Sequence, residues 1–309
     1  MADAIFKALE MEPAEKHARL QRMQKRISSY NVYAWAFDFF NQTSEIKKQQ
    51  DLTNIRLITD SLANKIITDY HNASSRILFL DYDGTLVSFT KYPELTILDV
   101  ETVEIIKKLT IDPKNQIVII SGRSKEFLEK EFLGINITLV AEHGYFIKFP
   151  GKGWNTTIET GPEWKNSILP ILNEYVNRCN GTSIEEKTGS IAWHYRNADS
   201  DFAQLRLHEL RDDLTEIIRH KTDFEILEGN KVLEVKSGKY DKGQAAKTLM
   251  KNKHFDFVLA AGDDRTDESL FKQLNSSAYT IRVGLSPSMA RFNISDFYLL
   301  IKLLKDLAD

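Results

Sequence analysis

The sequence predicts an α/β fold with a doubly wound, Rossmann-like parallel sheet, a smaller inserted α/β cap and a helical N-terminal extension. The core is predicted by short apolar runs that lack polar alternation and that each end in polar or acidic residues. Such runs are typical of parallel strands buried on both faces. They are Ile77–Leu80, Ile117–Ile120, Ile137–Val140 and Phe257–Ala261. Helical patterns lie between them at Asp99–Leu109, Ser124–Leu133 and Lys242–Met250, as a doubly wound fold requires.

Residues 1–72 form the predicted N-terminal extension. Apolar residues recur there at three- and four-residue steps, which is typical of amphipathic helices. They are Ile5 and Leu9, then Leu20, Met23 and Ile27, then Val32, Trp35 and Phe39. We expect the polar stretch Asn41–Asp51 to be a linker and Leu52–Tyr70 to be a further helix. The extension is expected to pack on the main body.

Residues 151–231 are expected to form the cap, because the rhythm of the core stops there. Two long helical patterns, Asn166–Cys179 and Phe202–His220, alternate with stretches of two-residue periodicity. In Ile191–Arg196 the large apolar side chains share one face of a strand. Helices and an open sheet inserted between core strands predict a small α/β cap. The core then consists of residues 73–150 and 232–309.

Composition excludes several classes of protein. The 309 residues are 42% hydrophobic, and 41 Lys plus Arg against 44 Asp plus Glu give a net charge of −3. That balance provides no broad basic surface for nucleic acid or anionic lipid. The single cysteine, Cys179, fits a reducing compartment. The first residues lack the uncharged stretch of a signal peptide, and no run reaches the roughly 18 apolar residues of a membrane span. We therefore expect a soluble, cytoplasmic protein.

Chemically active side chains are concentrated directly after the predicted strands. Asp81–Leu86 follow the first run, Ser121–Arg123 follow the second and Gly262–Asp267 follow a late one, while Lys242 lies at a predicted helix start. Ligands of open α/β sheets bind at the carboxyl ends of the strands. We therefore expect these carboxylates, one hydroxyl and one ammonium group to converge at one edge of the sheet.

A divalent cation is expected among these carboxylates. Two carboxylates about 4 Å apart repel each other by roughly 4 kcal/mol at an effective dielectric constant near 20. Hard oxygen ligands, without clustered Cys or His, favour Mg²⁺ over Zn²⁺. A magnesium site in turn suits a phosphorylated substrate, because a phosphate monoester carries about −1.5 to −2 charges at neutral pH.

The spacing Asp81-x-Asp83 indicates the type of reaction. Two carboxylates two residues apart at a strand end can both reach one phosphoryl group. We expect Asp81 to attack phosphorus and form an aspartyl-phosphate, while Asp83 protonates the leaving sugar oxygen and then activates the hydrolytic water. Lys242 and the Ser121 hydroxyl would hold the phosphoryl oxygens. Asp81, the Asp83 backbone carbonyl and Asp263 would hold Mg²⁺.

Several motifs, taken in this order, resemble those of known phosphatases. Asp81–Thr85, Ser121–Arg123, Lys242-Gly243 and Gly262–Asp267 resemble the four motifs of the haloacid dehalogenase-like phosphatases. Ala141-Glu142-His143-Gly144, Trp193–Asn197, Leu233-Glu234-Val235 and Gly262–Glu268 narrow the resemblance to the trehalose-6-phosphate phosphatase family. The resemblance covers residues about 74 to 300. It implies a haloacid dehalogenase-like core with a cap, and Mg²⁺-dependent hydrolysis of trehalose 6-phosphate to trehalose and phosphate.

Carried over residue by residue, the resemblance assigns roles to individual side chains. It implies Asp81 as the nucleophile, Asp83 as the acid and base, and Asp81, Asp83 and Asp263 as the magnesium site. Ser121, Arg123 and Lys242 fall on the phosphate side. The positions that hold the glucose hydroxyls match Glu185, Lys187, Arg196, Lys231 and Glu234. Carboxylates suit that task because they accept hydrogen bonds from paired sugar hydroxyls.

One segment departs from the family pattern. The family usually has Arg-Pro and a later Gly after Glu234-Val235, whereas this sequence continues as Lys236-Ser237-Gly238. The distance from Glu234 to Lys242 is nevertheless kept.

The N-terminal extension resembles a second family. Ala4–Met11 and Arg22–Phe39 are similar to the final helices of trehalose-6-phosphate synthases. The resemblance implies a chain that was cut from, or descended from, a fused synthase-phosphatase. A fused or associated synthase is therefore an expected partner.

Some of these residues have a second interpretation. Ser121 could only cap the helix that starts near Ser124, and Lys242 could be a solvated lysine at a helix start. Asp267 could ligate the metal through water or brace its loop. His143 and His194 could be structural hydrogen-bonding residues or substrate contacts.

Glu185 and Lys187 lie beside a Thr188-Gly189 turn, where exposed charges are ordinary, so they need not contact a substrate.

The function also has alternatives. The chain could act on another sugar phosphate, such as a sucrose or mannosyl phosphate. It could also be a catalytically silent domain that binds sugar phosphate or supports a synthase.

Overall fold

The computed structural model describes residues 2–29, 55–88, 96–158, 161–219, 223–229, 231–274 and 276–309. The predicted linker Asn41–Asp51 and the apolar positions Val32, Trp35 and Phe39 lie outside these residues. The chain forms two compact units, residues 1–54 and residues 55–309. In the described part of the first unit, helices α1 (Ala2–Leu9) and α2 (Pro13–Ser29) contain the apolar positions predicted from Ile5 to Ile27.

Helix α4 (Asp60–Asn72) opens the second unit and buries Ile66 and Tyr70. The prediction of a helix from Leu52 was wrong at its start, because Ile55–Ile58 are not helical and Leu57 forms a bridge with Asn293. Thr59 sets the boundary: its backbone is extended and its side chain accepts a hydrogen bond from Leu62 N. A capping residue of this kind cannot itself be helical, so the helix begins after it.

The second unit is built on an eight-stranded sheet in the order β12-β11-β10-β1-β2-β3-β4-β5. Neighbouring strands are parallel from β12 to β3, and β4 and β5 pair antiparallel at one edge. All residues of β1 are buried, as predicted for a central parallel strand. The strands are β1 Arg76–Leu80, β2 Asn115–Ile120, β3 Thr138–Ala141, β4 Phe146–Lys148, β5 Trp154–Thr156, β10 Phe257–Gly262, β11 Tyr279–Val283 and β12 Phe292–Ile294.

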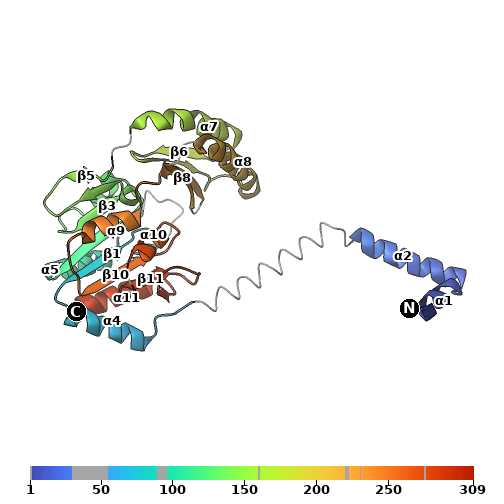
Figure 1. Cartoon of the computed structure of the whole chain (residues 1–309), viewed down its shortest axis with the longest axis horizontal. Helices are drawn as coiled ribbons and strands as arrows, with labels where there is room; N and C mark the ends of the chain where they lie inside the picture. Colours follow the sequence, from blue (N-terminus) through green and yellow to red (C-terminus); the bar gives the residue numbers. More distant parts are fainter. Residues whose placement is uncertain are drawn as a thin grey trace. The chain divides into compact units, whose positions relative to one another are not determined.

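Helices cover both faces of this sheet (Figure 1). Successive residues of a strand point to opposite faces, so Leu78 and Leu80 pack in the layer that includes α4, α5 (Val100–Ile111) and α11 (Phe297–Ala308). Ile77 and Phe79 pack on the other side against α9 (Lys242–Met250) and α10 (Asp267–Gln273). The short helix α6 (Lys125–Glu131) follows β2. These two layers confirm the doubly wound α/β fold.

A second, four-stranded antiparallel sheet has the order β6-β7-β9-β8. Helices α7 (Lys165–Arg178) and α8 (Ser200–Ile218) pack on it around the buried Trp193. Its strands are β6 Ser183–Glu186, β7 Ser190–His194, β8 Phe224–Gly229 and β9 Val232–Ser237. Strand β5 lies within the residues expected for the cap but pairs with β4, and β9 lies within the residues expected for the core but pairs in the smaller sheet.

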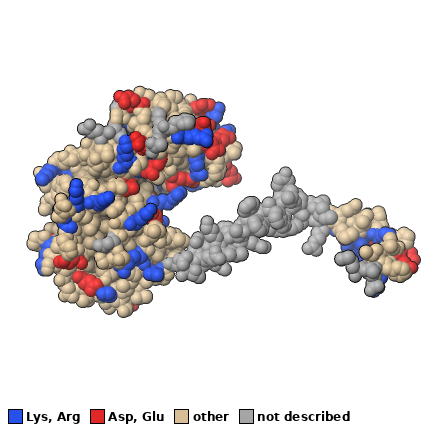
Figure 2. Space-filling model, viewed as in Figure 1, with Lys and Arg blue, Asp and Glu red and all other residues tan. Residues whose placement is uncertain are grey.

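Acidic and basic side chains lie next to one another on the surface. Figure 2 shows both signs mixed on the face in view, and ion pairs such as Arg178–Glu174, with a 2.5 Å separation, occur along α7. Exposed pairs of this kind contribute little to stability. Among the described residues, no helix combines the length and the apolar composition that a membrane span requires.

Candidate active site

A cavity of about 460 Å³ lies where the carboxyl ends of the core strands meet the smaller sheet. Its lining brings together most of the predicted site residues. From the core come Asp81, Asp83, Ser121, Arg123 and Lys242, and from the smaller sheet and its loops come Glu185, Lys187, Arg196 and Glu234. The predicted edge of the sheet is therefore where the cavity forms.

Lys242 links two carboxylates at the floor of the cavity. Its Nζ lies 2.7 Å from Asp81 Oδ1 and 2.7 Å from Asp267 Oδ1. Lys242 is only 2% exposed, so it is not a solvated lysine at a helix start. Burial lowers the pKa of Lys242, but Asp267 and Asp81 outweigh burial and raise it. Lys242 therefore stays charged and fixes the orientation of Asp81.

Asp267 braces the loop after β10. Its Oδ2 accepts hydrogen bonds of 3.0 Å from the backbone N–H groups of Asp263 and Asp264. The side chain packs directly on Gly262, where a Cβ atom would overlap its carboxyl group. Both oxygens of Asp267 are thus occupied by donors, which favours the bracing role over ligation of a metal.

Asp263 has an unsatisfied oxygen that fits a cation. Its Oδ1 is buried and has no hydrogen-bond partner among the described residues. Oxygens of Asp81, Asp263 and Asp267 lie within 4.8 Å of one another. Burial, with the charges of Asp264 and Asp267, raises the pKa of Asp263 to about 8. Burial also raises the pKa of Asp81 well above its usual value, although Lys242 opposes the shift. Crowded hard oxygens with one orphan among them match the donor set that Mg²⁺ prefers.

Asp83 is held by Arg123 in a bidentate ion pair. Arg123 Nε lies 2.7 Å from Asp83 Oδ2, and Arg123 Nη2 lies 2.5 Å from Asp83 Oδ1. Gly84 turns the chain directly after Asp83 with a φ of 76°, a conformation that glycine adopts without strain. The sequence predicted Arg123 on the phosphate side, and the structure places its guanidinium on the second carboxylate of the Asp-x-Asp motif.

Ser121 does not cap the following helix. The N-cap of α6 is Ser124, whose side chain accepts a hydrogen bond from Phe127 N. Ser121 is 1% exposed, and its Oγ accepts a hydrogen bond of 3.1 Å from Arg123 N. Among the described residues the Ser121 hydroxyl donates to none, and Ser121 lines the cavity, so its proton can point into it.

Glu234 organises the side of the cavity formed by the smaller sheet. Its carboxylate accepts a hydrogen bond of 2.5 Å from Ser190 Oγ and lies 3.3 Å from His143 Nε2 and 3.6 Å from Lys187 Nζ. Burial raises the pKa of Glu234, but Lys187, His143 and Ser190 outweigh burial and hold it well below its usual value. Lys187 also donates a hydrogen bond of 3.1 Å to the backbone carbonyl of Gly122.

Both histidines that the sequence left undecided contact a carboxylate of the site. His194 Nε2 lies 2.8 Å from Glu185 Oε2, and His143 contacts Glu234. Glu185 faces Ala192 across the β6–β7 hairpin, so His194 is its diagonal neighbour on the same face. A predicted hairpin register could have found this contact. No sequence signal connects His143 with Glu234.

Lys231 stands apart from the other predicted sugar-binding residues. It is not among the described residues that line the cavity, and its Nζ lies 5.6 Å from the centre of the Tyr195 ring. Its backbone has a φ of 64°, which is uncommon for a lysine.

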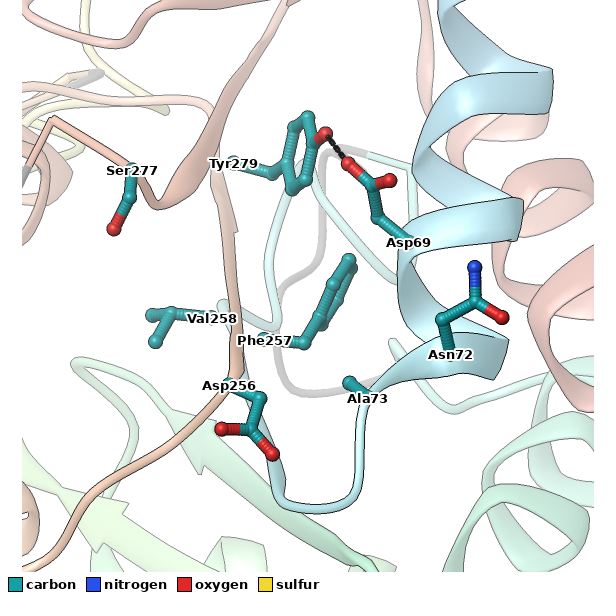
Figure 3. A pocket seen from close by; sticks show the side chains of 8 residues that line it. All are labelled: Asp69, Asn72, Ala73, Asp256, Phe257, Val258, Ser277 and Tyr279. Carbon is teal, nitrogen blue, oxygen red and sulfur yellow. Dashed lines mark hydrogen bonds between the residues drawn. The ribbon is translucent and has the colours of Figure 1, made fainter.

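A second cavity of about 390 Å³ lies at the opposite edge of the sheet, beside the amino ends of β10 and β11 (Figure 3). Figure 3 shows the Tyr279 hydroxyl donating to Asp69, with an oxygen separation of 2.5 Å. Its described lining contains none of the predicted site residues: Asp69, Asn72, Ala73, Asp256, Phe257, Val258, Ser277 and Tyr279. The predicted site residues therefore lie at the carboxyl ends of the strands and not at the amino ends, where this second cavity lies.

Comparisons with known proteins agree with this geometry. The chain is 36% identical over 308 residues to the bifunctional trehalose-6-phosphate synthase/phosphatase of Thermoproteus tenax, covering 99% of this chain and 42% of that protein. The chain spans about two fifths of the length of the curated relatives it matches. It is also similar to the C-terminal domain of the C. albicans trehalose-6-phosphate phosphatase, with 28% identity and a TM-score of 0.77 over 82% of this chain and 98% of that one.

A more distant structure supports the fold alone. A haloacid dehalogenase-like hydrolase from B. subtilis has 16% identity and a TM-score of 0.54, over 74% of this chain and 98% of that one. A family model described as trehalose-phosphatase matches residues 79–299, which include every predicted site residue. The chain therefore belongs to the trehalose-phosphatase family.

Proposed function

We propose that this chain hydrolyses trehalose 6-phosphate to trehalose and phosphate, with Mg²⁺ as cofactor and Asp81 as nucleophile. The observation that carries the proposal is a single cavity with two kinds of lining. Asp81, Ser121 and Lys242 line it on one side, and Glu185, Lys187 and Glu234 line it on the other. The first group suits a phosphoryl group and the second suits sugar hydroxyls. A volume of about 460 Å³ lies in the usual range of small-molecule sites.

Asp81 and Asp263 would hold Mg²⁺, together with the backbone carbonyl of Asp83. The orphaned Oδ1 of Asp263 supports this choice, and the occupied oxygens of Asp267 argue against a third carboxylate ligand. When bound, Mg²⁺ would neutralise part of the negative charge that substrate and carboxylates bring together.

The reaction proceeds in two steps, and residues of this chain act in both. A carboxylate oxygen of Asp81 forms a bond to phosphorus while the bond from phosphorus to the sugar oxygen breaks, and Asp83 gives that oxygen a proton. Asp83 then takes a proton from water, whose oxygen bonds to phosphorus and displaces the Asp81 carboxylate. Lys242 and Ser121 hold the phosphoryl oxygens during both steps. Phosphate leaves and both aspartates return to their starting state.

Arg123 determines the state of Asp83 before the reaction begins. Both oxygens of Asp83 are bound by the guanidinium, so Asp83 has to leave that pair and take up a proton from solvent before it can protonate the sugar oxygen. The substrate phosphate is an alternative partner for a planar guanidinium. We infer that Arg123 exchanges Asp83 for the incoming phosphate, which joins the predicted phosphate role to the observed ion pair.

The sugar would bind between core and cap. Glu185, Lys187, Arg196 and Glu234 would hold its hydroxyls, with Lys231 as a further contact. We propose that the cap, which consists of the smaller sheet with α7 and α8, opens from the core to admit a disaccharide and closes to exclude water. A cytoplasmic location and a fused or associated synthase belong to the same proposal, the latter supported by the bifunctional relative.

A substrate panel tests this function. Phosphate release is measured from trehalose 6-phosphate, a sucrose phosphate and mannosyl phosphates, with and without a chelator. The proposal expects trehalose 6-phosphate to be preferred, the activity to vanish with chelator and Mg²⁺ to restore it. Equal rates on all substrates would remove the specificity, and no release from any of them would favour the silent binding domain.

A further inference from the structure

The backbone N–H and C=O groups of Gly189, in the turn between β6 and β7, are each held by a buried core side chain. Gly189 N donates a hydrogen bond of 2.9 Å to Glu142 Oε2. Gly189 O accepts one of 2.8 Å from the Tyr240 hydroxyl. Glu142 is 3% exposed and Tyr240 is 2% exposed, so neither bond competes with bulk water. We call these three residues the Gly189 clamp.

The clamp leaves no space for a side chain at position 189. A Cβ atom on Gly189 would lie 2.6 Å from Tyr145 Cδ2 and 2.6 Å from the Tyr240 hydroxyl oxygen. Tyr145 and Tyr240 also pack edge to face, with ring centres 5.2 Å apart. The clamp is therefore a close fit between the backbone of one glycine in the β6–β7 turn and the core.

Glu142 reaches Gly189 from an unusual backbone conformation. Its φ is 48°, in the left-handed region that a glutamate rarely adopts. Two backbone hydrogen bonds hold it there, from Glu142 N to Arg123 O at 2.9 Å and from Tyr145 N to Glu142 O at 3.2 Å. Strained conformations of this kind persist where the surroundings require them, often at functional sites.

The clamp is connected on both sides to the active site. Lys187, two residues before Gly189, donates to Gly122 O, and Ser190, directly after it, donates to Glu234. Tyr240 lies two residues before Lys242, which contacts Asp81. Burial lowers the pKa of Lys187, but Glu234, Glu185 and Glu142 outweigh it, so the Glu142 carboxylate also favours the cationic form of Lys187.

We propose that Glu142 and Tyr240 are positioning residues that set where Lys187 and Glu234 stand relative to the phosphate site, and thereby determine the preference for a sugar phosphate. This inference rests on the proposed function and deepens it. The described lining of the cavity includes neither Glu142 nor Tyr240, so both act through Gly189. The small phosphate ester of a non-sugar alcohol should not depend on them.

Kinetics on two substrates test this role. For E142A and Y240F we expect the KM for trehalose 6-phosphate to rise roughly five- to tenfold, the effect of one hydrogen bond. The kcat/KM for p-nitrophenyl phosphate should stay within about twofold. E142Q should recover the wild-type KM, because its amide oxygen can still accept from Gly189 N. The matched control is Y175F, since the Tyr175 hydroxyl donates to Asp213 within the cap at 2.7 Å. Equal losses on both substrates, or no loss, would overturn the inference.

Hydrogen exchange tests the clamp without substrate. In E142A the Gly189 amide should exchange at least about tenfold faster than in the wild type, because its acceptor is gone. Unchanged exchange would contradict the clamp. If the wild type shows no preference for trehalose 6-phosphate over p-nitrophenyl phosphate, the proposed function fails, and the exchange rate still decides whether the clamp exists. Y240F, which lacks a single oxygen atom, carries the kinetic test if E142A does not fold.

Discussion

Lys187 donates a hydrogen bond of 3.1 Å to the backbone carbonyl of Gly122. Lys187 follows β6 of the smaller sheet, and Gly122 lies between Ser121 and Arg123 in the core loop after β2. The Lys187 ammonium group therefore contacts the loop of residues 121–123, on the phosphate side of the cavity, and lies 3.6 Å from the Glu234 carboxylate. Lys187 thus connects the sugar side of the cavity with the phosphate side.

Replacing Lys187 should weaken substrate binding. K187A removes a charged donor from a site that is 12% exposed, and hydrogen bonds to charged groups contribute about 1.5–3 kcal/mol. We expect the KM for trehalose 6-phosphate to rise roughly ten- to hundredfold. Steady-state kinetics would measure it, with K239A as the matched control because Lys239 forms an exposed pair with Asp223. A normal KM in K187A would contradict the assignment.

Glu234 predicts a pH-dependent contribution to stability. Its pKa in the folded protein lies below the usual 4.5, since Lys187, His143 and Ser190 outweigh burial. The stability that it provides is therefore complete above about pH 4.5 and is lost as the pH falls below that value. E234Q should cost about 3 kcal/mol at pH 7, because the buried Lys187 loses its partner.

Urea unfolding of the wild type and E234Q between pH 3 and pH 7 measures this difference. We expect the gap between the two proteins to narrow as the pH falls. The exposed substitution E126Q should leave the free energy of unfolding nearly unchanged at every pH. A gap that is constant over the whole range would show that the Glu234 carboxylate is not stabilised by its neighbours.

The orphaned oxygen of Asp263 predicts a metal-dependent melting temperature. Mg²⁺ that binds only the folded protein stabilises it by the free energy of binding at the concentration used. This stabilisation raises Tm. We expect the wild type to gain several degrees with millimolar Mg²⁺ and D263N to gain much less. Calorimetry with and without chelator measures this, with D256N at the opposite edge of the sheet as the control. Identical gains in D263N and the wild type would exclude Asp263 as a ligand.

A substitution at Gly262 tests the bracing role of Asp267. In G262A the new Cβ would overlap the Asp267 carboxyl group, which holds the N–H groups of Asp263 and Asp264 and the Lys242 ammonium. We expect a loss of about 2 kcal/mol or more in the free energy of unfolding, together with most of the activity. G153A is the matched control, because nothing lies within 4 Å of a Cβ there. Equal stability of both variants would refute the bracing role.

The sequence was most informative where one periodicity dominates. The continuous apolar runs predicted β1, β2, β3 and β10 within a few residues, because a strand buried on both faces excludes polar side chains. The edge strands β5 and β12, and β4 beside β5, span only three residues each and carry no such pattern. The start of α4 was missed because one side chain, Thr59, ends the extended segment before it.

The candidate site was predictable in its location but not in its contacts. Topology alone brings Asp81, Asp263 and Lys242 to one edge of a parallel sheet, and the structure joins Lys242 to Asp81 at 2.7 Å. The pairing of Arg123 with Asp83 and of Glu142 with Gly189 depends on side-chain conformation and on a left-handed backbone residue. Neither feature leaves a periodic signal in the sequence.

Phosphate release by D81N is the most direct test of the central claim. With saturating trehalose 6-phosphate and Mg²⁺, we expect D81N to lose at least about a thousandfold in rate, since a neutral amide replaces the nucleophilic carboxylate. D69N, whose carboxylate accepts from Tyr279 at the other edge of the sheet, should keep full activity. Circular dichroism and Tm establish that both variants are folded. Full activity in folded D81N would contradict the account.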